Sequence, residues 1–289
     1  MTQTTNELCN RSSADICLIG FDTETTGKYP LGAEICEIAA VKWMNGQMVD
    51  RFQTLIQPST PMHPEVIAIH GITNEMVANA PKISEIIEDF YRFIQDGILI
   101  AHHAPFDLGF LSIEFEKSNL PLPQLPVICS SLLSRKLFPD SSNHRLQTLI
   151  KYFNLNQGTA HRALDDAQAC LEVGLRCLNR LGGEVLSSAI LQKAFEAQGG
   201  ELSWHRFSLA AISSQPTVTQ IVSAINTKSE INMRYEAGSH PGHFRRVRPE
   251  GIVRSLDGDY IVAYAEADRK SKRYLLEKIS SAERISEKK

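Results

Sequence analysis

The sequence predicts an α/β domain followed by a second, smaller all-β domain. In the first half, short apolar runs typical of buried strands alternate with stretches whose apolar residues recur at helical spacing. After residue 216, four short runs of alternating hydrophobicity are separated by turns that contain glycine. The charge divides in the same way: residues 1–220 hold 16 basic and 23 acidic side chains, net −7, and residues 221–289 hold 14 and 10, net +4. We therefore expect an acidic body that carries a basic C-terminal domain.

The composition is that of a folded protein outside membranes. The chain has 289 residues, of which 43% are hydrophobic, enough for two modest cores. No apolar run approaches the roughly 20 residues that cross a bilayer, and the first twenty residues lack the pattern of a secretion signal. We expect a cytoplasmic protein with no membrane partner. Its six cysteines form no CxxC pair, so neither a zinc site nor a disulfide framework is indicated.

The first domain is expected over residues 14–181, after a flexible N-terminus at 1–13. Strands are predicted at 16–21, 35–43 and 48–56, and the Asn45-Gly46 turn makes the last two a hairpin. These three strands form a meander in the simplest interpretation. Strands and helices then alternate, with helices that follow Pro81 and begin at Pro105. The expected elements are a helix at 83–93, a strand at 97–101, a helix at 105–115, a strand at 127–129, and helices at 146–153 and 163–181.

The rest of the chain is expected to hold a connector and the small domain. Residues 182–215 have a weak helical pattern between glycine pairs and a break near Pro216, so we interpret them as a helical connector. The second domain, 216–289, begins with a helix at 218–225. Its strands are predicted at 231–235, 246–253, 260–264 and 273–276.

Two carboxylates end the first predicted strand. Asp22 and Glu24 lie two residues apart, so both side chains leave the same face of the strand. Two close carboxylates repel each other unless a cation lies between them. The alternative is a solvated strand end before the turn at Thr26-Gly27.

Two further segments place acids beside apolar runs. Asp107 lies in the first turn of the helix that begins at Pro105, where the helix dipole also favours an acid for purely structural reasons. His161 and Asp166 are five residues apart, about 140° around an ideal helix, so they would not share a face if both were helical. We expect His161 to precede the helix and Asp166 to lie within it, with Asp165 as a solvated or capping acid.

Taken together, these segments resemble a known family. Residues 21–27 (FDTETTG), 102–107 (HHAPFD) and 161–166 (HRALDD), with 34–41 and 69–73, resemble the motifs of DnaQ-like exonucleases of the DEDDh branch. The resemblance implies a ribonuclease-H-like fold, a mixed sheet flanked by helices, and removal of nucleotides from the 3′ end of a nucleic acid. It also implies two Mg²⁺ or Mn²⁺ ions, which suit hard oxygen ligands.

The resemblance assigns a role to each matching residue. Asp22 would bridge the two ions, Glu24 and Asp166 would complete the site of the ion that activates water, and Asp107 would hold the second ion. His161 would be the general base, since imidazole titrates near neutral pH. The residues implied for substrate binding are Thr23, Thr25, His70, His102 and Phe106, and for Phe106 simple core packing is an equal alternative. The sequence departs from the family at His103, where the family usually has Asn.

The C-terminal domain combines basic and aromatic residues. Basic groups hold phosphates and aromatic faces stack bases, but the tyrosines would equally form the core of a small barrel with solvated charges. Residues 231–235, 246–251, 259–264 and 273–279 resemble the WYL domain, which implies an Sm-like or SH3-like barrel with a nucleic-acid or ligand pocket. Arg248 and Arg273 fall on motif positions expected to line that pocket. Asp259-Tyr260-Ile261 replaces the family's Trp-Tyr-Leu, and Glu277-Lys278 replaces its more usual Asp-Arg.

We therefore expect a metal-dependent 3′-to-5′ exonuclease that acts on single-stranded DNA in repair or processing. The alternatives are an RNA-trimming exoribonuclease, and a regulatory nucleic-acid-binding protein that uses the nuclease fold as a scaffold. The complete set of four acids and His161 argues against the scaffold. No segment identifies a protein partner.

Overall fold

The computed structural model describes residues 16–156, 158–182 and 187–285. These residues divide into two compact units, one made of residues 16–26 with the described part of 35–204, the other of 27–34 with 205–285. The flexible terminus expected at 1–13 lies outside the described residues. Residues 27–34 link the first two strands of the first unit, yet they belong to the second unit, and no sequence pattern indicated this.

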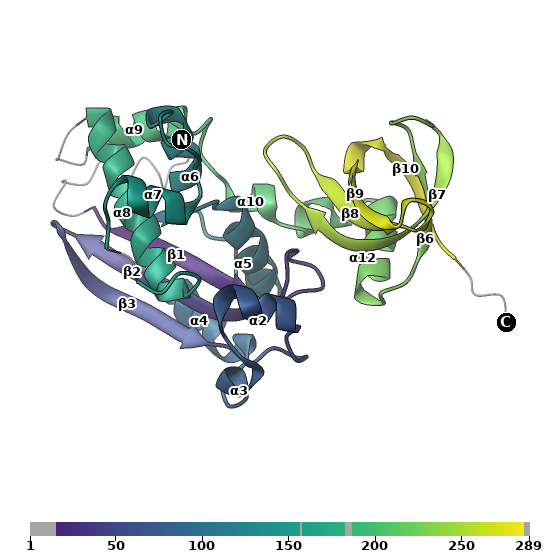
Figure 1. Ribbon diagram of the computed structural model, residues 1–289, viewed down its shortest axis with the longest axis horizontal. Coiled ribbons are helices and arrows are strands. Elements are labelled where there is room, and N and C mark those ends of the chain that lie inside the picture. The colour runs from purple at the N-terminus through teal and green to yellow at the C-terminus, as the bar shows by residue number, and fades with distance from the viewer. Residues whose placement is uncertain (1–15, 157, 183–186, 286–289) are drawn as a thin grey trace. The chain divides into compact units, whose positions relative to one another are not determined.

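The first unit is built on a five-stranded mixed sheet in the order β3-β2-β1-β4-β5 (Figure 1). The strands β1 (Leu18–Thr25), β2 (Ile35–Met44) and β3 (Gln47–Leu55) pair antiparallel, which confirms the predicted meander. The strand β4 (Ile98–Ala101) runs parallel to β1, and β5 (Val127–Cys129) runs parallel to β4. The mixed sheet with flanking helices is the expected α/β architecture.

One face of this sheet packs against the long helix α8 (Ala163–Gly182). The approach is so close that a Cβ on Gly20 of β1 would lie 2.5 Å from the carbonyl oxygen of Ala167 and 2.7 Å from the Cβ of Leu171. Strand residues alternate between faces, so Asp22 and Glu24 share the face of Gly20. The shared face confirms what the two-residue spacing predicted, and the structure adds that this face is the one toward α8.

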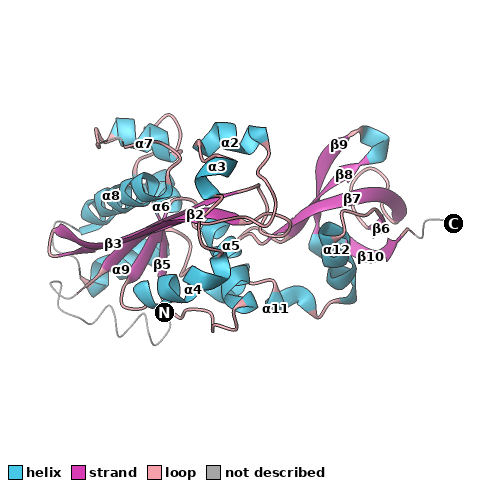
Figure 2. Cartoon of the chain, turned by 90° about the horizontal axis from the view of Figure 1, so that it is seen from below, coloured by secondary structure: helices cyan, strands magenta, loops and turns pink. Residues whose placement is uncertain are grey.

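Two helices pack together on the opposite face. Phe52 of β3 lies 5.5 Å from Phe90 and 5.7 Å from Phe93, ring centre to ring centre, and both belong to α4 (Ile83–Phe93). Tyr91 of α4 stacks edge-on against Phe115 of α5 (Pro105–Lys117) at 5.2 Å. Figure 2 shows this layering of helices on both sides of the sheet. The helices bury both faces of β1, β4, β5 and most of β2, which explains why these strands are nearly continuous apolar runs in the sequence. The edge strand β3 is largely exposed.

Shorter helices complete the first unit. The predicted helix at 146–153 is α7 (Leu146–Tyr152). Other helices had no prediction, since each is too short to show a clear period: α2 (Pro64–His70), α3 (Asn74–Val77) and α6 (Ser130–Leu137).

The connector expected at 182–215 does contain helices, namely α9 (Ser188–Ala197), α10 (Trp204–Phe207) and α11 (Ala210–Ser213). Its first part is fixed to the sheet of the first unit. The Gln198 side chain accepts the Cys129 N–H at 2.9 Å and donates to the Val127 carbonyl at 3.0 Å.

The second unit is a five-stranded antiparallel sheet in the order β10-β6-β7-β8-β9. Four of its strands match the predicted runs: β6 (Ile231–Tyr235), β7 (His243–Val253), β8 (Tyr260–Ala265) and β9 (Lys270–Leu275). The fifth, β10 (Ile279–Arg284), had no prediction because its buried residues Ile279 and Ala282 are three positions apart and do not alternate strictly. The described strands show no pairing of β9 with β10, so closure into a barrel stays a prediction.

The core of the second unit forms between this sheet and α12 (Pro216–Asn226). Tyr235 and Tyr274 are buried in it, with ring centres 5.1 Å apart. Leu31, from the inserted segment 27–34, packs against the same cluster. Tyr29 from that segment lies directly on Gly251 of β7, where any larger residue would overlap it. In the described part of the chain, no helix is long and apolar enough to cross a membrane.

Candidate active site

Four carboxylates from three elements meet at the end of β1 that faces α8. Asp22 and Glu24 come from β1, Asp107 from the first turn of α5, and Asp166 from the first turn of α8. Each of Asp22 and Glu24 is close enough to Asp107 and Asp166 for mutual repulsion to raise its pKa. The fold therefore brings together the acids that lie up to 144 positions apart in the sequence.

The surroundings make it costly to ionise these acids. Burial, then repulsion from Asp166, raises the pKa of Glu24 to about 8. Burial raises the pKa of Asp107 to about 7, and the pKa of Asp22 is raised strongly by burial and by its acidic neighbours. Burial also raises the pKa of Asp166. Buried carboxylates that repel one another are stable as anions when a cation lies among them, so this donor set fits a divalent metal ion.

Asp107 is held by the strand that carries the other acids. Its Oδ1 accepts the Thr23 N–H at 3.0 Å and the Thr23 hydroxyl at 2.7 Å. These bonds fix the orientation of the carboxylate. Thr23, expected to bind the terminal nucleotide, thus uses its side chain within the protein.

His161 lies on the loop before α8, as predicted, with Asp166 inside the helix. Its imidazole is exposed, and one of its ring nitrogens and carboxylate oxygens of Glu24 and Asp166 all lie within 4.8 Å of one another. The backbone N–H of His161 donates to Asp166 Oδ2 at 3.1 Å. Asp165 accepts the Thr159 N–H at 2.7 Å, so it caps this loop. The geometry places an accessible imidazole beside two of the four acids.

His102 and His103 take different positions after β4. Both ring nitrogens of His102 are engaged within the protein, with Ser130 Oγ at 2.9 Å and the His144 carbonyl at 3.0 Å. Burial lowers its pKa to about 4, which keeps the ring neutral. His103 is exposed and has a φ of 63°. Asn adopts this left-handed conformation readily, which gives a backbone reason for the family's usual Asn at this position.

The remaining residues expected to bind substrate lie around the end of β1. His70 is buried at the end of α2; its Nδ1 accepts the Ile72 N–H at 3.0 Å, and it also interacts with the backbone of Thr25. Thr25 itself is buried. Phe106 is half-buried, and its ring centre lies 4.9 Å from that of Phe110, so it packs on the core while part of its face stays accessible.

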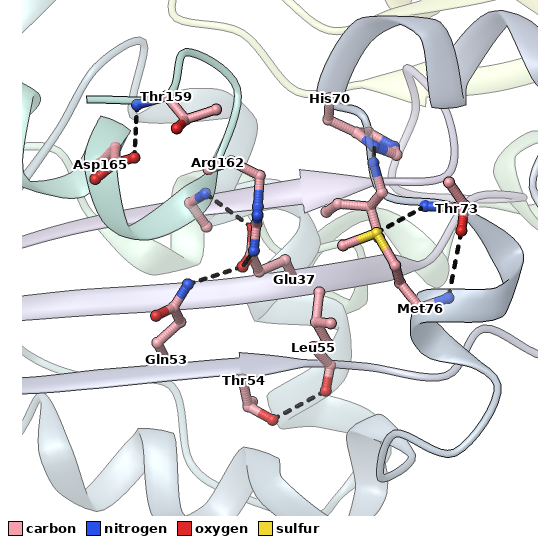
Figure 3. Close-up of polar contacts among 12 residues, drawn as sticks. Glu37, Gln53, Thr54, Leu55, His70, Thr73, Met76, Thr159, Arg162 and Asp165 are labelled. Carbon is pink, nitrogen blue, oxygen red and sulfur yellow. Dashed lines mark hydrogen bonds and ion pairs between the residues drawn. The ribbon is translucent and has the colours of Figure 1, made fainter. Parts of the chain in front are cut away.

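The structure adds two residues that sequence reasoning left without a role. Glu37 of β2 lies opposite Glu24 in the strand register and is fully buried. It forms an ion pair with Arg162, whose Nη2 lies 2.8 Å from Glu37 Oε1 (Figure 3). A signal was present, since Glu37 is a charged residue inside the apolar run ICEIAAV.

An open surface cavity of about 520 Å³ lies along α7. Gln147 in its wall points its Nε2 toward Asp166 Oδ1, 3.4 Å away. The cavity also offers an exposed lysine and an exposed tyrosine ring. Its lining comprises Ser141, Ser142, Gln147, Thr148, Lys151 and Tyr152.

In the second unit, arginines lie over tyrosine rings on one face of the sheet. The Arg248 guanidinium is 5.3 Å from the ring centre of Tyr264, and that of Arg273 is 5.1 Å from the ring centre of Tyr260. Both arginines are exposed and both tyrosines are half-buried. Tyr235 and Tyr274 fill the core of this unit, whereas Tyr260 and Tyr264 lie under arginines on the sheet face.

Comparison with known proteins decides the family. The family model described as Exonuclease matches residues 19–173, more than half of the chain. The chain belongs to the exonuclease family. The model of the WYL domain matches residues 216–284. The first unit thus contains an exonuclease domain, and a WYL domain follows it.

The curated relatives match this exonuclease through one part of their length. The DNA polymerase III PolC-type protein of Halalkalibacterium halodurans is 42% identical over 149 residues, which are 52% of this chain and 10% of the relative. The protein of the same name from Bacillus subtilis is 39% identical over 159 residues, 55% of this chain and 11% of the relative. The chain therefore spans about a tenth of these relatives.

A solved structure supports the fold. The zinc-bound E. coli ExoI–ssDNA complex aligns with a TM-score of 0.54 and 13% identity, over 87% of this chain and 54% of the other. At this identity the likeness concerns the fold alone.

Proposed function

We propose that the protein is a divalent-metal-dependent 3′-to-5′ exonuclease that removes nucleotides from single-stranded DNA. The observation that carries the proposal is the meeting of Asp22, Glu24, Asp107 and Asp166 beside the exposed imidazole of His161. This set has the donors for two Mg²⁺ or Mn²⁺ ions and a group that can accept a proton. The complete set favours an enzyme over a binding scaffold.

The side chains would divide the work as follows. Two bound ions would polarise the phosphate and stabilise charge on the attacking and leaving oxygens. Asp22 would contribute to both ions, Glu24 and Asp166 to one, and Asp107 to the other. His161 would take the proton of the attacking water, because its ring is exposed beside Glu24 and Asp166.

The substrate would be bound by groups around the end of β1. The backbone near Thr23 and Thr25 would contact the terminal nucleotide, and Phe106 and His70 would contact its base or sugar. His102 would act by holding Ser130 and the His144 carbonyl, since both its nitrogens are used there. The cavity beside Asp166 has room for the preceding part of the strand, with Lys151 available for a phosphate.

The name of the curated relatives, DNA polymerase III, favours DNA over RNA.

The role of the C-terminal domain is a second part of the proposal. Arg248 and Arg273, each over a tyrosine ring, present positive charge and aromatic surface on one sheet face. Such a face suits single-stranded nucleic acid or a nucleotide-like ligand. The basic charge of this part of the chain, +4 over residues 221–289, agrees with a polyanionic partner.

The experiment that tests the activity is digestion of single-stranded DNA and of RNA of the same sequence, each labelled at the 5′ end, with Mg²⁺ or Mn²⁺. A ladder that shortens from the 3′ end and is absent with His161→Ala supports the proposal, and the faster strand identifies the sugar. Intact strands in every condition, with binding retained, would contradict it and favour the scaffold.

The C-terminal role is tested by binding of the same labelled DNA in the absence of divalent metal. The double variant Arg248→Ala with Arg273→Ala should bind less tightly and should lose about 0.7 in the slope of log affinity against log salt for each phosphate contact removed. Lys228→Ala, on an exposed turn of the same unit, is the matched control. Equal slopes for the double variant and the unmodified protein would contradict this role.

A further inference from the structure

Glu37 is a buried carboxylate with every acceptor position used. It is 0% exposed. Its Oε1 accepts from Arg162 Nη2 at 2.8 Å and from Gln53 Nε2 at 2.9 Å. Its Oε2 accepts from Arg162 Nε at 3.1 Å and from the backbone N–H of Ala163 at 3.0 Å. Figure 3 shows these bonds converging on Glu37 from β3 and from the start of α8. A carboxylate offers about four acceptor sites, so Glu37 is fully satisfied.

The charge state of Glu37 follows from these bonds. Burial acts to raise its pKa, but the hydrogen bonds from Arg162, Ala163 and Gln53 outweigh it, and the pKa is lowered. Glu37 is therefore an anion next to Glu24 on the neighbouring strand. The ion pair with Arg162 compensates this charge, but Glu37 still contributes to the repulsion that raises the pKa of Asp22 and of Glu24.

Two of the three partners of Glu37 are the residues that follow His161, and the third is Gln53. In the sequence, Arg162 and Ala163 lie between His161 and Asp166. By binding both residues, Glu37 fixes the loop one residue after His161. On its other side the loop is held by the Thr159 N–H bond to Asp165. His161 itself has a φ of 59°, a left-handed conformation that is unfavourable for a non-glycine residue. Such a conformation persists only where its surroundings hold it.

We propose that Glu37 and Arg162 are positioning residues that hold His161 in this left-handed conformation beside Glu24 and Asp166. The proposal rests on the proposed exonuclease function and specifies how its base is placed. Glu37 is fully buried and the Arg162 side chain is 30% exposed, and such an ion pair is weak evidence for stability, so we assign it a positional role. That role is to tie β2, next to the metal site, to the loop that carries the imidazole.

The test measures kcat and KM for a 5′-labelled single-stranded DNA with Mn²⁺, together with the Mn²⁺ concentration for half activation and the thermal midpoint. Arg162→Ala should lower kcat by about 10- to 100-fold, since a misplacement of about 1 Å can cost about 100-fold. KM and the Mn²⁺ requirement should stay within about twofold. Arg180→Ala, which removes an exposed arginine in the last turn of α8, is the matched control and should keep the kcat of the unmodified protein.

Three comparisons separate positioning from other roles. Glu37→Gln should lower kcat as Arg162→Ala does, and the double variant should be no worse, because the two residues act as a unit. In a His161→Asn background, Arg162→Ala should have no further effect. Arg162→Lys keeps the charge but loses the two-pronged contact, and it should recover only part of the kcat.

An unchanged kcat in Arg162→Ala would overturn the proposal. So would a loss that appears in KM, which would make Arg162 a phosphate ligand, or a full effect in the His161→Asn background. If the unmodified protein cleaves neither DNA nor RNA, the proposed function fails first. If it cleaves and the variants equal it, only the positioning role fails.

Discussion

Substitution of Gly20 by alanine should damage catalysis without touching any of the acids. Gly20 lies on β1 two residues before Asp22 and faces α8. An added Cβ would lie 2.5 Å from the Ala167 carbonyl oxygen and 2.7 Å from the Leu171 Cβ, whereas ordinary contact begins at 3.4 Å. The obstacle is helix backbone, which cannot rotate away. The strand and the helix would therefore have to separate by about 0.9 Å at this point.

This separation acts on the site because Ala167 directly follows Asp166. Moving α8 away from β1 moves Asp166 away from Asp22 and Glu24, which share the face of Gly20. Overpacking of this kind typically costs about 1–3 kcal/mol of folding free energy. A shift of about 1 Å between groups that act together can cost about 100-fold in rate. We expect Gly20→Ala to be less stable by that amount and to lose about 10- to 100-fold in kcat.

The assay combines urea unfolding with initial rates of cleavage of labelled single-stranded DNA in Mn²⁺. Gly174→Ala is the matched control: it lies on the same helix, and its added Cβ would meet a side-chain methyl of Ile100 at 2.9 Å, away from the acids. It should lose stability but keep its kcat. A Gly20→Ala protein with normal kcat, or a Gly174→Ala protein with an equal loss of kcat, would refute the role assigned to the β1–α8 contact.

Three further outcomes are expected. Asp22→Ala should abolish cleavage, and near-normal cleavage would contradict the place of Asp22 in the metal site. In urea unfolding without metal the variant should be equally or more stable, because burial and acidic neighbours raise the pKa of Asp22 and make its anion costly. Burial lowers the pKa of His102 from 6.5 to about 4. Between these two pH values the unfolded chain binds a proton that the folded protein does not. The free energy of unfolding therefore falls as the pH drops from 6.5 to 4, by up to about 3 kcal/mol. His102→Gln should flatten this part of the stability curve relative to the unmodified protein, and parallel curves would count against the assignment. Gly251→Ala should destabilise the second unit by about 1–3 kcal/mol in the same assay, because the new methyl group overlaps the Cβ and Cγ atoms of Tyr29. Adding Tyr29→Gly, which removes both atoms, should recover part of the loss, and additive losses would disprove that contact.

Local patterns in the sequence determined most elements of the fold. The alternation of apolar runs with helical periods predicted the strands at 35–43 and 48–56 and the helix at 83–93 to within a residue of their observed ends. The two-residue spacing of Asp22 and Glu24 determined that they share a face, and the five-residue spacing of His161 and Asp166 determined that the helix begins between them. These properties depend on periods of 2 and 3.6 residues, which short segments carry by themselves.

Only the tertiary structure decided which of these groups meet and what holds them. The contact of Gly20 with Ala167, the ion pair of Glu37 with Arg162 across 125 positions, and the bonds of Thr23 to Asp107 across 84 positions join segments with no shared local pattern. The packing of Tyr29 on Gly251 is of the same kind. Long-range contacts depend on how complete elements fill space against each other, and the left-handed conformation of His161 depends on the bonds at both sides of its loop. The sequence by itself therefore singled out the four acids and His161 as candidates, and the packed structure decided that they meet at one site.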